Sequence, residues 1–493
     1  MADHRLLSFA ESRRKAALAT LDGDTQSELG QFFTPVTAAV LIASLARLPE
    51  TGTLKVLDPG AGSGVLSAAL VDRVLKERPG LSLHILAVER DSSVLPYLKE
   101  TLAACEQAGE GRITAIAVEA DFIMYSTGLD ASLLGDTGFD VVIQNPPYGK
   151  LASTSPHRKA LLSTGVDAPN LYAAFLALSA EALLPGGQLV AITPRSFFNG
   201  AYFGSFRGFL LDRIALDRVH VFESRSTVFA DTGVLQENVI FSGTRDGERK
   251  TVELSVSRDH NGEVAVRQVP YCDVVRPNDV HRFIRLVTDN EDDASAELMM
   301  SMPCSLADLG VTVSTGRVVD FRSRDALHDD RVPDAHPLIY PGNLRAPGFE
   351  WPRDIRKPQW FAPKAPKDVS LLLPEGWYTV VKRFSSKEER RRVVASAWSP
   401  VEHPGPVAFE NHLNVFHIKG TGLDEAIARG LAAWLNSSLV DRFFRTFSGH
   451  TQVNATDLRA LRFPTSATLK ELGQATSIVQ SELDAFVLSR ITA

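Results

Sequence analysis

Apolar strand-like runs alternate with helix-like segments between residues 54 and 222, and this alternation constrains the fold more than any other feature of the sequence. Runs rich in β-branched residues, such as Ile113 to Val118, are separated by segments with a helical spacing of apolar residues, such as Val65 to Lys76. Strands that alternate with helices form mostly parallel sheets with helices on both faces. The pattern therefore predicts an α/β fold built on a doubly wound, mostly parallel sheet.

Four consecutive predicted strands end in a polar side chain. These side chains belong to Asp58, Glu89, Asp121 and Asn145. In an open α/β sheet the carboxyl ends of parallel strands share one edge, and ligands bind there. A single acid at a strand end is usually a helix cap or a solvated turn, but four in series favour one shared site.

The fourth strand, Phe139 to Ile143, leads into Asn145-Pro146-Pro147-Tyr148. Two prolines after an apolar run indicate a strand that stops at a sharp turn. The side-chain oxygen of Asn145 and an adjacent carbonyl oxygen can accept both hydrogens of an exocyclic amino group, while Tyr148 offers a ring for stacking. These hydrogen bonds localise the nitrogen lone pair, so the amine can attack an electrophile without a strong base. We expect this turn to be catalytic; an ordinary Pro-Pro turn is the alternative.

The first strand runs into a glycine-rich loop, Asp58 to Gly64. Glycines such as Gly60 and Gly62 let a backbone approach a ligand closely. The spacing is tighter than in the dinucleotide pattern G-x-G-x-x-G, and a pyrophosphate would be poorly placed beside the carboxylate of Asp58. A cationic or neutral ligand is therefore favoured.

Two further strand ends suggest a nucleoside. Glu89 lies 25 residues after Gly64 (89 − 64), where such units place a ribose-binding acid. Asp121 can accept a hydrogen bond from an adenine amino group, and Phe122 beside it can cover the ring.

An element with two adjacent phenylalanines, Gln31-Phe32-Phe33-Thr34-Pro35, precedes the apolar helix Val36 to Leu48. Thr34 as N-cap and Pro35 at the first helical position predict the helix start. Phe33 also suits the wall of a ligand site, although packing alone would explain it.

The composition limits where the protein works. The 493 residues contain no stretch of eighteen apolar residues, and the N-terminus lacks an apolar signal core, so we expect a soluble protein that is not exported. Three scattered cysteines show no metal-ligand spacing and suit a reducing cytoplasm. We expect no bound metal.

The charge is unevenly distributed. The formal net charge of −7 gives no overall attraction to nucleic acid, but residues 343 to 400 carry twelve Lys and Arg against six Asp and Glu. Aromatic residues interleave with these cations, which suits DNA phosphate and base contacts, while a solvated basic loop is the alternative. We expect Lys382, Arg383 and the run Arg390-Arg391-Arg392 to contact phosphates.

The pattern divides the chain into residues 1–245 and residues 246–493. The β/α alternation breaks near Gly243, and irregular short strands follow, with an amphipathic helix predicted from Ala432 to Arg445. Phe229 lies just before this break and can stack on a base opposite Tyr148; core packing is the alternative.

Together these stretches resemble the γ-class N6-adenine DNA methyltransferases of type II restriction-modification systems, in particular the group that includes the PstI and BsuBI methylases. The resemblance covers residues 28 to about 242. Its motifs match Gln31 to Pro35, Asp58 to Gly64, Glu89, Asp121 with Phe122, Asn145 to Tyr148, and Asn170 to Phe175. It implies that the cofactor-binding residues are Phe33, Thr34, Pro35, Asp58, Gly60, Ala61, Gly62, Glu89, Asp121, Phe122 and Phe175.

The resemblance implies a class I methyltransferase fold in residues 1–245 and a target-recognition domain in residues 246–493. It also implies S-adenosylmethionine as methyl donor, double-stranded DNA as partner, and a target adenine flipped out of the duplex onto Asn145, Pro146, Pro147 and Tyr148. A cognate endonuclease would act separately, and the protein would be a monomer or a dimer.

Other functions share parts of this pattern. RNA and protein-glutamine N-methyltransferases use the same turn. The lone pair of an amide nitrogen, like that of an aromatic amine, must be localised before it can attack an electrophile. A non-catalytic DNA-binding specificity protein is a further alternative, against which Asp58, Glu89 and Asn145 argue. A fused nuclease would have to use Asp231 with Glu248 to Lys250, which read more simply as a charged turn.

Overall fold

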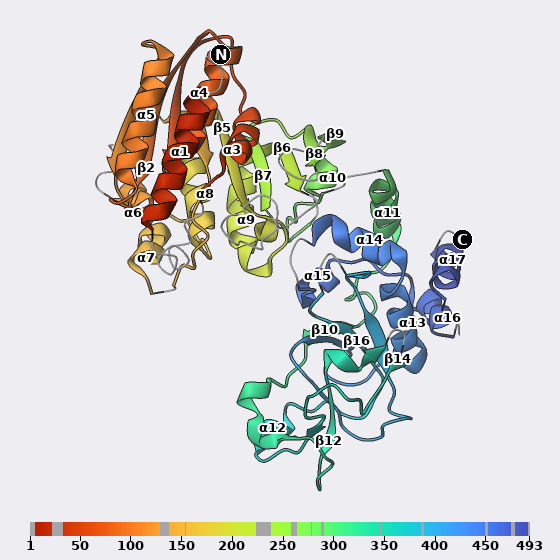
Figure 1. The fold of residues 1–493 in the computed structure, drawn as a ribbon. Helices are drawn as coiled ribbons and strands as arrows, with labels where there is room; N and C mark the ends of the chain where they lie inside the picture. The colour runs from red at the N-terminus through yellow and green to blue at the C-terminus, as the bar shows by residue number, and fades with distance from the viewer. Residues whose placement is uncertain are drawn as a thin grey trace. The chain divides into compact units, whose positions relative to one another are not determined.

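The computed structural model divides the chain into two compact units, Met1–Thr288 and Asp289–Ala493 (Figure 1). None of the helices in the described residues combines the length and apolar character that crossing a bilayer requires. The structure describes residues 5–21, 33–128, 138–152, 154–222, 238–257, 264–277, 279–286, 290–345, 348–385, 389–448, 452–474 and 479–491.

The first unit is built on a nine-stranded sheet in the order β3-β2-β1-β4-β5-β7-β6-β8-β9. The strands are β1 (Thr51–Pro59), β2 (Gly80–Glu89), β3 (Ile113–Glu119), β4 (Phe139–Gln144), β5 (Leu183–Pro194), β6 (Ile214–Phe222), β7 (Asn238–Arg245), β8 (Thr251–Ser257) and β9 (Ala265–Pro270). Strands β1 to β5 pair in parallel with one another, and β7 lies antiparallel between β5 and β6. This confirms the predicted doubly wound, mostly parallel sheet of the class I methyltransferase fold.

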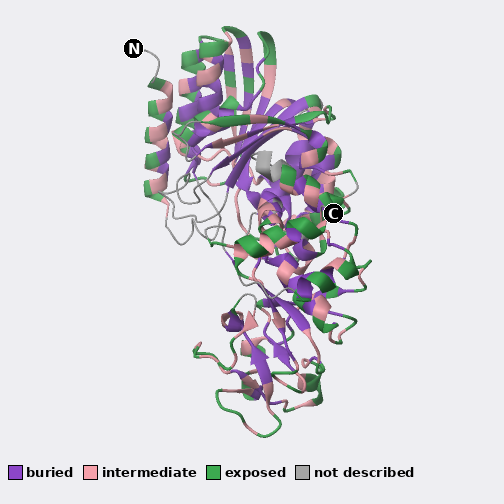
Figure 2. Cartoon of the chain, turned by 90° about the vertical axis from the view of Figure 1, so that its right-hand side faces the viewer, coloured by how far each residue is buried: buried purple, intermediate pink, exposed green. Residues whose placement is uncertain are grey.

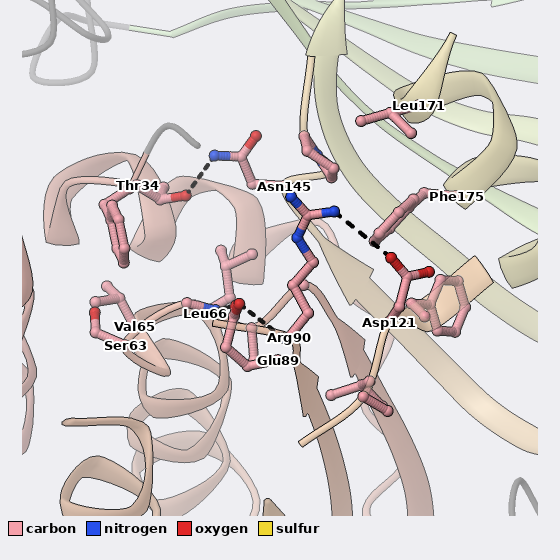
Figure 3. Close-up of a pocket in the computed structure, with 18 of the residues that line it drawn as sticks. Thr34, Ser63, Val65, Leu66, Glu89, Arg90, Asp121, Asn145, Leu171 and Phe175 are labelled. Carbon is pink, nitrogen blue, oxygen red and sulfur yellow. Dashed lines mark hydrogen bonds and ion pairs between the residues drawn. The ribbon is translucent and has the colours of Figure 1, made fainter. Parts of the chain in front are cut away.

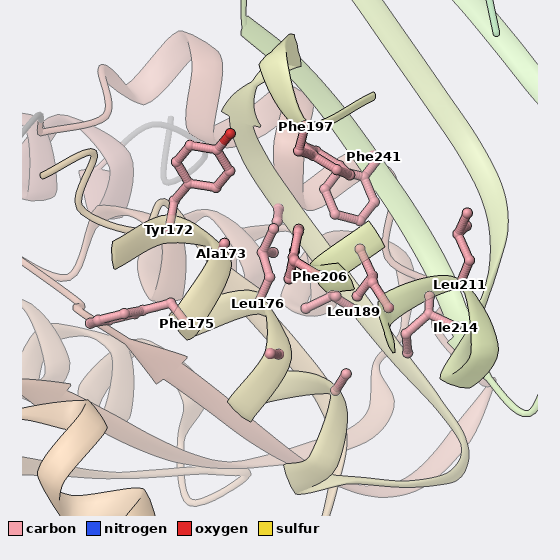
Figure 4. Packing of buried hydrophobic residues seen from close by; sticks show 14 of the residues in the cluster. Tyr172, Ala173, Phe175, Leu176, Leu189, Phe197, Phe206, Leu211, Ile214 and Phe241 are labelled. Atoms are coloured by element: carbon pink, nitrogen blue, oxygen red, sulfur yellow. The ribbon is translucent and has the colours of Figure 1, made fainter. Parts of the chain in front are cut away.

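Helices cover both faces of this sheet because its central strands are apolar on both sides. On β4, Val141 and Ile143 pack with one cluster of buried residues and Val142 packs with the other. The first cluster includes residues of α1 (Arg5–Thr20), α3 (Val36–Ser44), α4 (Val65–Glu77) and α5 (Leu95–Gly109). The second includes residues of α6 (Phe122–Thr127), α7 (Pro156–Ser163), α8 (Leu171–Ala182) and α9 (Gly204–Arg213), as Figure 4 shows for α8 and α9.

The strand order places a topological switch point between β1 and β4. The chain leaves β1 through α4 and returns as β2 on one side of β1, whereas β4 pairs with the other side of β1. The loops that follow β1 and β4 therefore diverge and leave a crevice at the carboxyl ends of these strands. The glycine-rich loop and the Asn145 turn both lie there.

The first unit extends beyond the expected boundary at residue 245. Strand β8 pairs in parallel with β6, and β9 pairs with β8. Val252 and Leu254 of β8 are buried in the same cluster as the central strands. The short helix α10 (Tyr271–Val274) follows β9. The sequence pattern missed this extension because β8 and β9 are not separated by a helix.

The second unit contains short strands. They form two four-stranded sheets, β10-β19-β16-β17 and β11-β15-β12-β18, and the pair β13-β14. The strands are β10 (Thr312–Thr315), β11 (Leu327–His328), β12 (His336–Ile339), β13 (Leu344–Arg345), β14 (Gly348–Phe349), β15 (Trp360–Phe361), β16 (Tyr378–Lys382), β17 (Ala395–Trp398), β18 (Ala408–Phe409) and β19 (Leu413–His417). Buried residues follow the strands in both units (Figure 2).

Helices complete the second unit. They are α11 (Asn290–Ser301), α12 (Pro366–Val369), α13 (Glu425–Leu435), α14 (Ser438–Phe447), α15 (Ala455–Arg459), α16 (Ser466–Gln474) and α17 (Gln480–Ile491). Short 3-10 helices in the two units are Arg195–Phe198, Ala201–Phe203, Asp320–Arg322, Arg324–Ala326 and Pro341–Asn343.

The helix expected from Ala432 to Arg445 is instead two helices, α13 and α14. Asn436 at the break donates its amide hydrogen to the Ala395 carbonyl at 2.8 Å and accepts from the Ala395 amide at 3.0 Å. Ser437 then caps α14 by accepting from the Val440 amide at 3.3 Å. Side-chain bonds of this kind compete with a continuous helix, which explains the break.

Candidate active site

A pocket opens at the switch point, at the carboxyl ends of β1, β2, β3 and β4 (Figure 3). It encloses about 860 Å³ of empty space, counting the part open to solvent. Its walls bring together predicted residues from separate parts of the sequence. These are Phe33, Thr34, Gly60, Ala61, Gly62, Glu89, Asp121, Phe122, Asn145, Pro147 and Phe175.

The glycine-rich loop forms one wall in a conformation that needs glycine. Gly60 and Gly62 have φ of 71° and 55°, in the left-handed region. A Cβ at Gly60 would lie 3.2 Å from the ring of Phe175, and one at Gly62 would lie 3.1 Å from the ring of Phe33. The loop is therefore held close to two aromatic walls, and any larger residue would push them apart.

Glu89 holds this loop in place. Its Oε2 accepts from the Gly62 amide at 2.9 Å, and its Oε1 accepts from the amides of Arg90 and Asp91 at 2.9 and 2.8 Å. These bonds use three of the four acceptor positions of the carboxylate. Burial raises the pKa of Glu89 against the lowering effect of these bonds.

Asp58 lies behind the glycine-rich loop and is not among the residues that line the pocket. The residue is fully buried, and its Oδ2 accepts from the Ser67 hydroxyl at 2.6 Å. Its Oδ1 accepts no hydrogen bond within the described residues. Burial raises the pKa of this carboxyl to about 7, helped by repulsion from Glu89.

Asp121 begins α6 and faces the pocket. Its Oδ1 caps the helix by accepting from the amides of Ile123 and Met124 at 3.1 and 3.2 Å. Its Oδ2 lies 2.9 Å from His157 Nε2 and 3.5 Å from Arg90 Nη1, whose side chain crosses the pocket in Figure 3. Sequence reasoning missed both residues, because only the folded chain brings them to this carboxylate.

Two aromatic rings stand beside Asp121. The rings of Phe122 and Phe175 have centroids 5.0 Å apart and planes inclined by 50°. Phe175 comes from α8, whose first turn is capped by Asn170 accepting from the Ala173 amide at 3.0 Å. Together these rings form a wall next to the Asp121 carboxylate, and a flat apolar ligand can stack against this wall.

The turn after β4 contacts the N-terminal element directly. Asn145 Nδ2 donates to Thr34 Oγ1 at 3.0 Å, so the amide oxygen is turned away from Thr34 (Figure 3). The expected cap role of Thr34 is wrong: Pro35 occupies the N-cap position, and no side chain caps α3 there. Thr34 instead orients the amide on which the proposed chemistry depends.

Tyr148 packs beside the pocket rather than forming its lining. Its ring meets the ring of Tyr172 edge-on, with centroids 6.3 Å apart, and Tyr172 OH lies 2.8 Å from Ser196 Oγ. Burial raises the pKa of Tyr148, so its hydroxyl stays protonated. Pro146 is buried, whereas Pro147 faces the pocket.

The predicted DNA contacts lie in the second unit. Arg390 is exposed, while Lys382, Arg383 and Arg391 are partly buried. Arg391 donates to the carbonyl of Asn436, and burial lowers the pKa of Lys382.

Arg392 does not fit the expected role. It is fully buried and donates to the carbonyl and the hydroxyl of Ser448, each at 3.1 Å, so it stabilises the unit from within. Phe229 lies outside the described residues.

Comparisons with known proteins agree with this geometry. A family model described as Eco57I restriction-modification methylase matches residues 81–229. Type II methyltransferase M.BsuBI of Bacillus subtilis is 42% identical over 91% of this chain and 90% of its own length. Type II methyltransferase M.PstI of Providencia stuartii is 39% identical over 94% of this chain and 92% of its own length.

Solved structures extend the likeness to the fold. A type IIL restriction-modification enzyme, MmeI, in complex with DNA, aligns over 89% of this chain and 69% of that chain, with a TM-score of 0.54 at 11% identity. A DrdV–DNA complex aligns over 96% of this chain and 60% of that chain, with a TM-score of 0.53 at 12% identity. The identity and coverage of the two Type II enzymes show that this chain belongs to the type II methyltransferases of restriction-modification systems.

Proposed function

We propose that the protein transfers a methyl group from S-adenosylmethionine to N6 of an adenine flipped out of double-stranded DNA. The observation that carries the proposal is the meeting of Asn145 with the glycine-rich loop, Glu89 and Asp121 in one pocket. In a cell, this activity would protect host DNA in the cytoplasm from a separate cognate endonuclease.

The residues of the pocket suit the donor. The close approach of the loop to Phe33 and Phe175 leaves no room for side chains at Gly60 and Gly62, so a ligand can approach the backbone there. Glu89 retains one acceptor position on Oε2, which suits a ribose hydroxyl. Asp121 with Phe122 and Phe175 suits an adenine amino group and ring, and the carboxyl of Asp58 places negative charge behind the loop for a cationic donor.

The turn after β4 suits the acceptor. The Asn145 amide oxygen and the Pro146 carbonyl accept the two amino hydrogens, and Tyr148 stacks on the flipped base. When bound, the donor supplies a methyl group on a sulfonium: the N6 lone pair forms the N–C bond as the S–C bond breaks. Asn145 and Pro146 stabilise the positive charge that develops on N6, which then loses a proton to water.

The second unit, together with the residues after 245, would recognise the target sequence. Its exposed cation Arg390, with Lys382, Arg383 and Arg391, would contact phosphates, and Phe229 would stack on the flipped base. The proposal does not depend on the oligomeric state.

The experiment uses donor carrying a radiolabelled methyl group, with genomic DNA from a methylation-deficient host as acceptor and total RNA and cell protein in parallel reactions. After digestion of the DNA to nucleosides, we expect the label in N6-methyl-2′-deoxyadenosine, and we expect none in RNA or protein. Label in a cytosine derivative would contradict the adenine assignment, and label in RNA or protein would contradict the DNA assignment.

A further inference from the structure

Three segments of the second unit converge on a small group of residues that we name the recognition tip: Arg383, Phe384 and His412. Arg383 and Phe384 follow β16, and His412 precedes β19. The Arg383 amide donates to the His412 carbonyl at 2.9 Å, and the Val453 amide donates to the Arg383 carbonyl at 2.6 Å. Backbone hydrogen bonds thus hold the tip in one conformation.

The tip presents an aromatic face to solvent. Phe384 is 43% exposed, and its ring centroid lies 4.9 Å from that of His412, with the planes inclined by 49°. Arg383 precedes Phe384 in the chain, and its Nη1 donates to the Asn411 carbonyl at 3.2 Å. Phe384 thus sets an exposed ring on a backbone that the neighbouring segments hold by hydrogen bonds.

A buried carboxylate holds the histidine. Glu410 is only 2% exposed, and its Oε1 lies 2.5 Å from His412 Nδ1, while its Oε2 accepts from the His412 amide at 2.9 Å. Both oxygens of the Glu410 carboxylate therefore contact His412, which is partly exposed. Because Nδ1 is fixed on Glu410, Nε2 on the other side of the ring points away from this carboxylate.

Stability alone does not explain this arrangement. Capping the turn needs only the bond between Glu410 Oε2 and the His412 amide, and burying a carboxylate is costly. The second oxygen orients an imidazole that is itself close to solvent. Orienting a surface side chain by a buried partner is how recognition sites are preorganised.

We propose that the recognition tip contacts base edges in the major groove of the target DNA; this rests on the proposed function. Phe384 offers an apolar contact for a thymine methyl group. His412 Nε2 can hydrogen-bond with groups on base edges, and Arg383 beside it keeps the phosphate contact proposed above. Glu410 is a positioning residue that acts through His412.

The test compares Phe384→Ala and His412→Ala with wild type and with a matched control, Phe321→Ala. Phe321 is 65% exposed in the same unit, and the Arg322 guanidinium lies 5.3 Å from its ring centroid, so the control also removes an exposed aromatic next to a cation. The DNA is a duplex that carries the site selected by wild-type binding from a library of random-sequence duplexes, and a second duplex with that site scrambled. Binding is measured by fluorescence anisotropy, separately from methyl transfer.

We expect each tip variant to bind the site about 10- to 100-fold more weakly, with binding of the scrambled duplex unchanged and Phe321→Ala like wild type. Glu410→Gln should weaken specific binding in the wild-type background but add little to His412→Ala, because it acts through that residue. A purely structural role of Glu410 would weaken binding equally in both backgrounds, contradicting its positioning role.

Equal specific binding by wild type and both tip variants would overturn the recognition tip and leave the proposed function intact. The converse is also distinguishable. Binding that depends on the tip, in a wild-type protein that transfers no methyl group to DNA, would support the tip and contradict the proposed function.

Discussion

Replacing Asp58 with asparagine should remove a large pH dependence from the stability of the unliganded protein. The carboxyl is fully buried, with its Oδ2 bonded to Ser67, and its pKa is raised from 3.8 to about 7. Asparagine has nearly the same shape but does not ionise in this range. The substitution therefore isolates the cost of burying this one charge.

The sign of this pH dependence follows from the direction in which burial shifts the pKa of Asp58. Because the folded pKa lies above the unfolded one, the stability associated with Asp58 is fully present below about pH 4 and is lost as the pH rises through about 7. Linkage with these two values gives a loss of about 2.5 kcal/mol between about pH 5 and about pH 8. Carboxylates with lowered pKa, such as Glu11 and Asp279, act in the opposite direction in wild type and variant alike.

The assay is urea unfolding of wild type and Asp58→Asn at those two pH values, without donor. We expect the free energy of unfolding of the variant, relative to wild type, to rise by about 2.5 kcal/mol from the lower to the higher pH. An equal difference at both pH values would refute the reasoning. Ser67→Ala, which removes the bond that favours the charged form, should strengthen the pH dependence of the wild type.

Three further predictions concern other parts of the protein. Thr34→Val should lower the rate of methyl transfer about tenfold, because Asn145 loses the hydrogen bond that orients its amide. Thr34→Ser keeps a hydroxyl for this bond and should retain the wild-type rate. Equal single-turnover rates for Thr34→Val and wild type would argue against this orienting role. Tyr148→Ala should abolish methyl transfer with little effect on donor affinity, and Tyr148→Phe should keep most of the rate, because the ring stacks and the hydroxyl stays protonated; a low rate for Tyr148→Phe would show that the hydroxyl is needed. Changing Arg390 and Arg391 together to glutamine should reduce the slope of log affinity against log salt by about 2, and an unchanged slope would remove them from the phosphate contacts.

The sheet and the main pocket were predictable because they depend on local patterns. β-branched runs separated by helical segments indicated β1 to β5, and the carboxyl ends of parallel strands share one edge whatever the details of packing. Asp121 and Asn145 could therefore be placed together from their positions after strands. Gly60 and Gly62 were predictable because few other residues adopt their conformation.

Long-range contacts were not predictable in the same way. Nothing local distinguishes Thr34 as a helix cap from Thr34 as a partner of Asn145, 111 positions away. Asp58 lies at the end of its strand as expected, but its carboxylate accepts from the Ser67 hydroxyl, which a strand-end pattern does not reveal. Arg90 reaches Asp121 because β2 pairs with β3, and His157 reaches it because α7 packs against α6.

The second unit was the hardest part to predict. Its strands are short, several of only two residues, such as β11 and β18, and so carry too little periodicity to be recognised. A run of three arginines indicated surface charge, yet Arg392 is buried, and its guanidinium donates a hydrogen bond to the Ser448 carbonyl. Strands β8 and β9 lie beyond the expected boundary at 245 and join the first sheet through strand pairing, which β/α alternation does not indicate.

The central claim is that Asn145 acts on the amino group of the acceptor and leaves donor binding to the rest of the pocket. The most direct test measures two quantities in Asn145→Ala: the single-turnover rate of methyl transfer to DNA and the Kd for S-adenosylhomocysteine. We predict that the rate falls by at least about 100-fold, because an acceptor for developing charge is lost, while the Kd stays within about threefold of wild type. A rate close to that of wild type, or a loss of rate explained entirely by a weaker Kd, would contradict the claim.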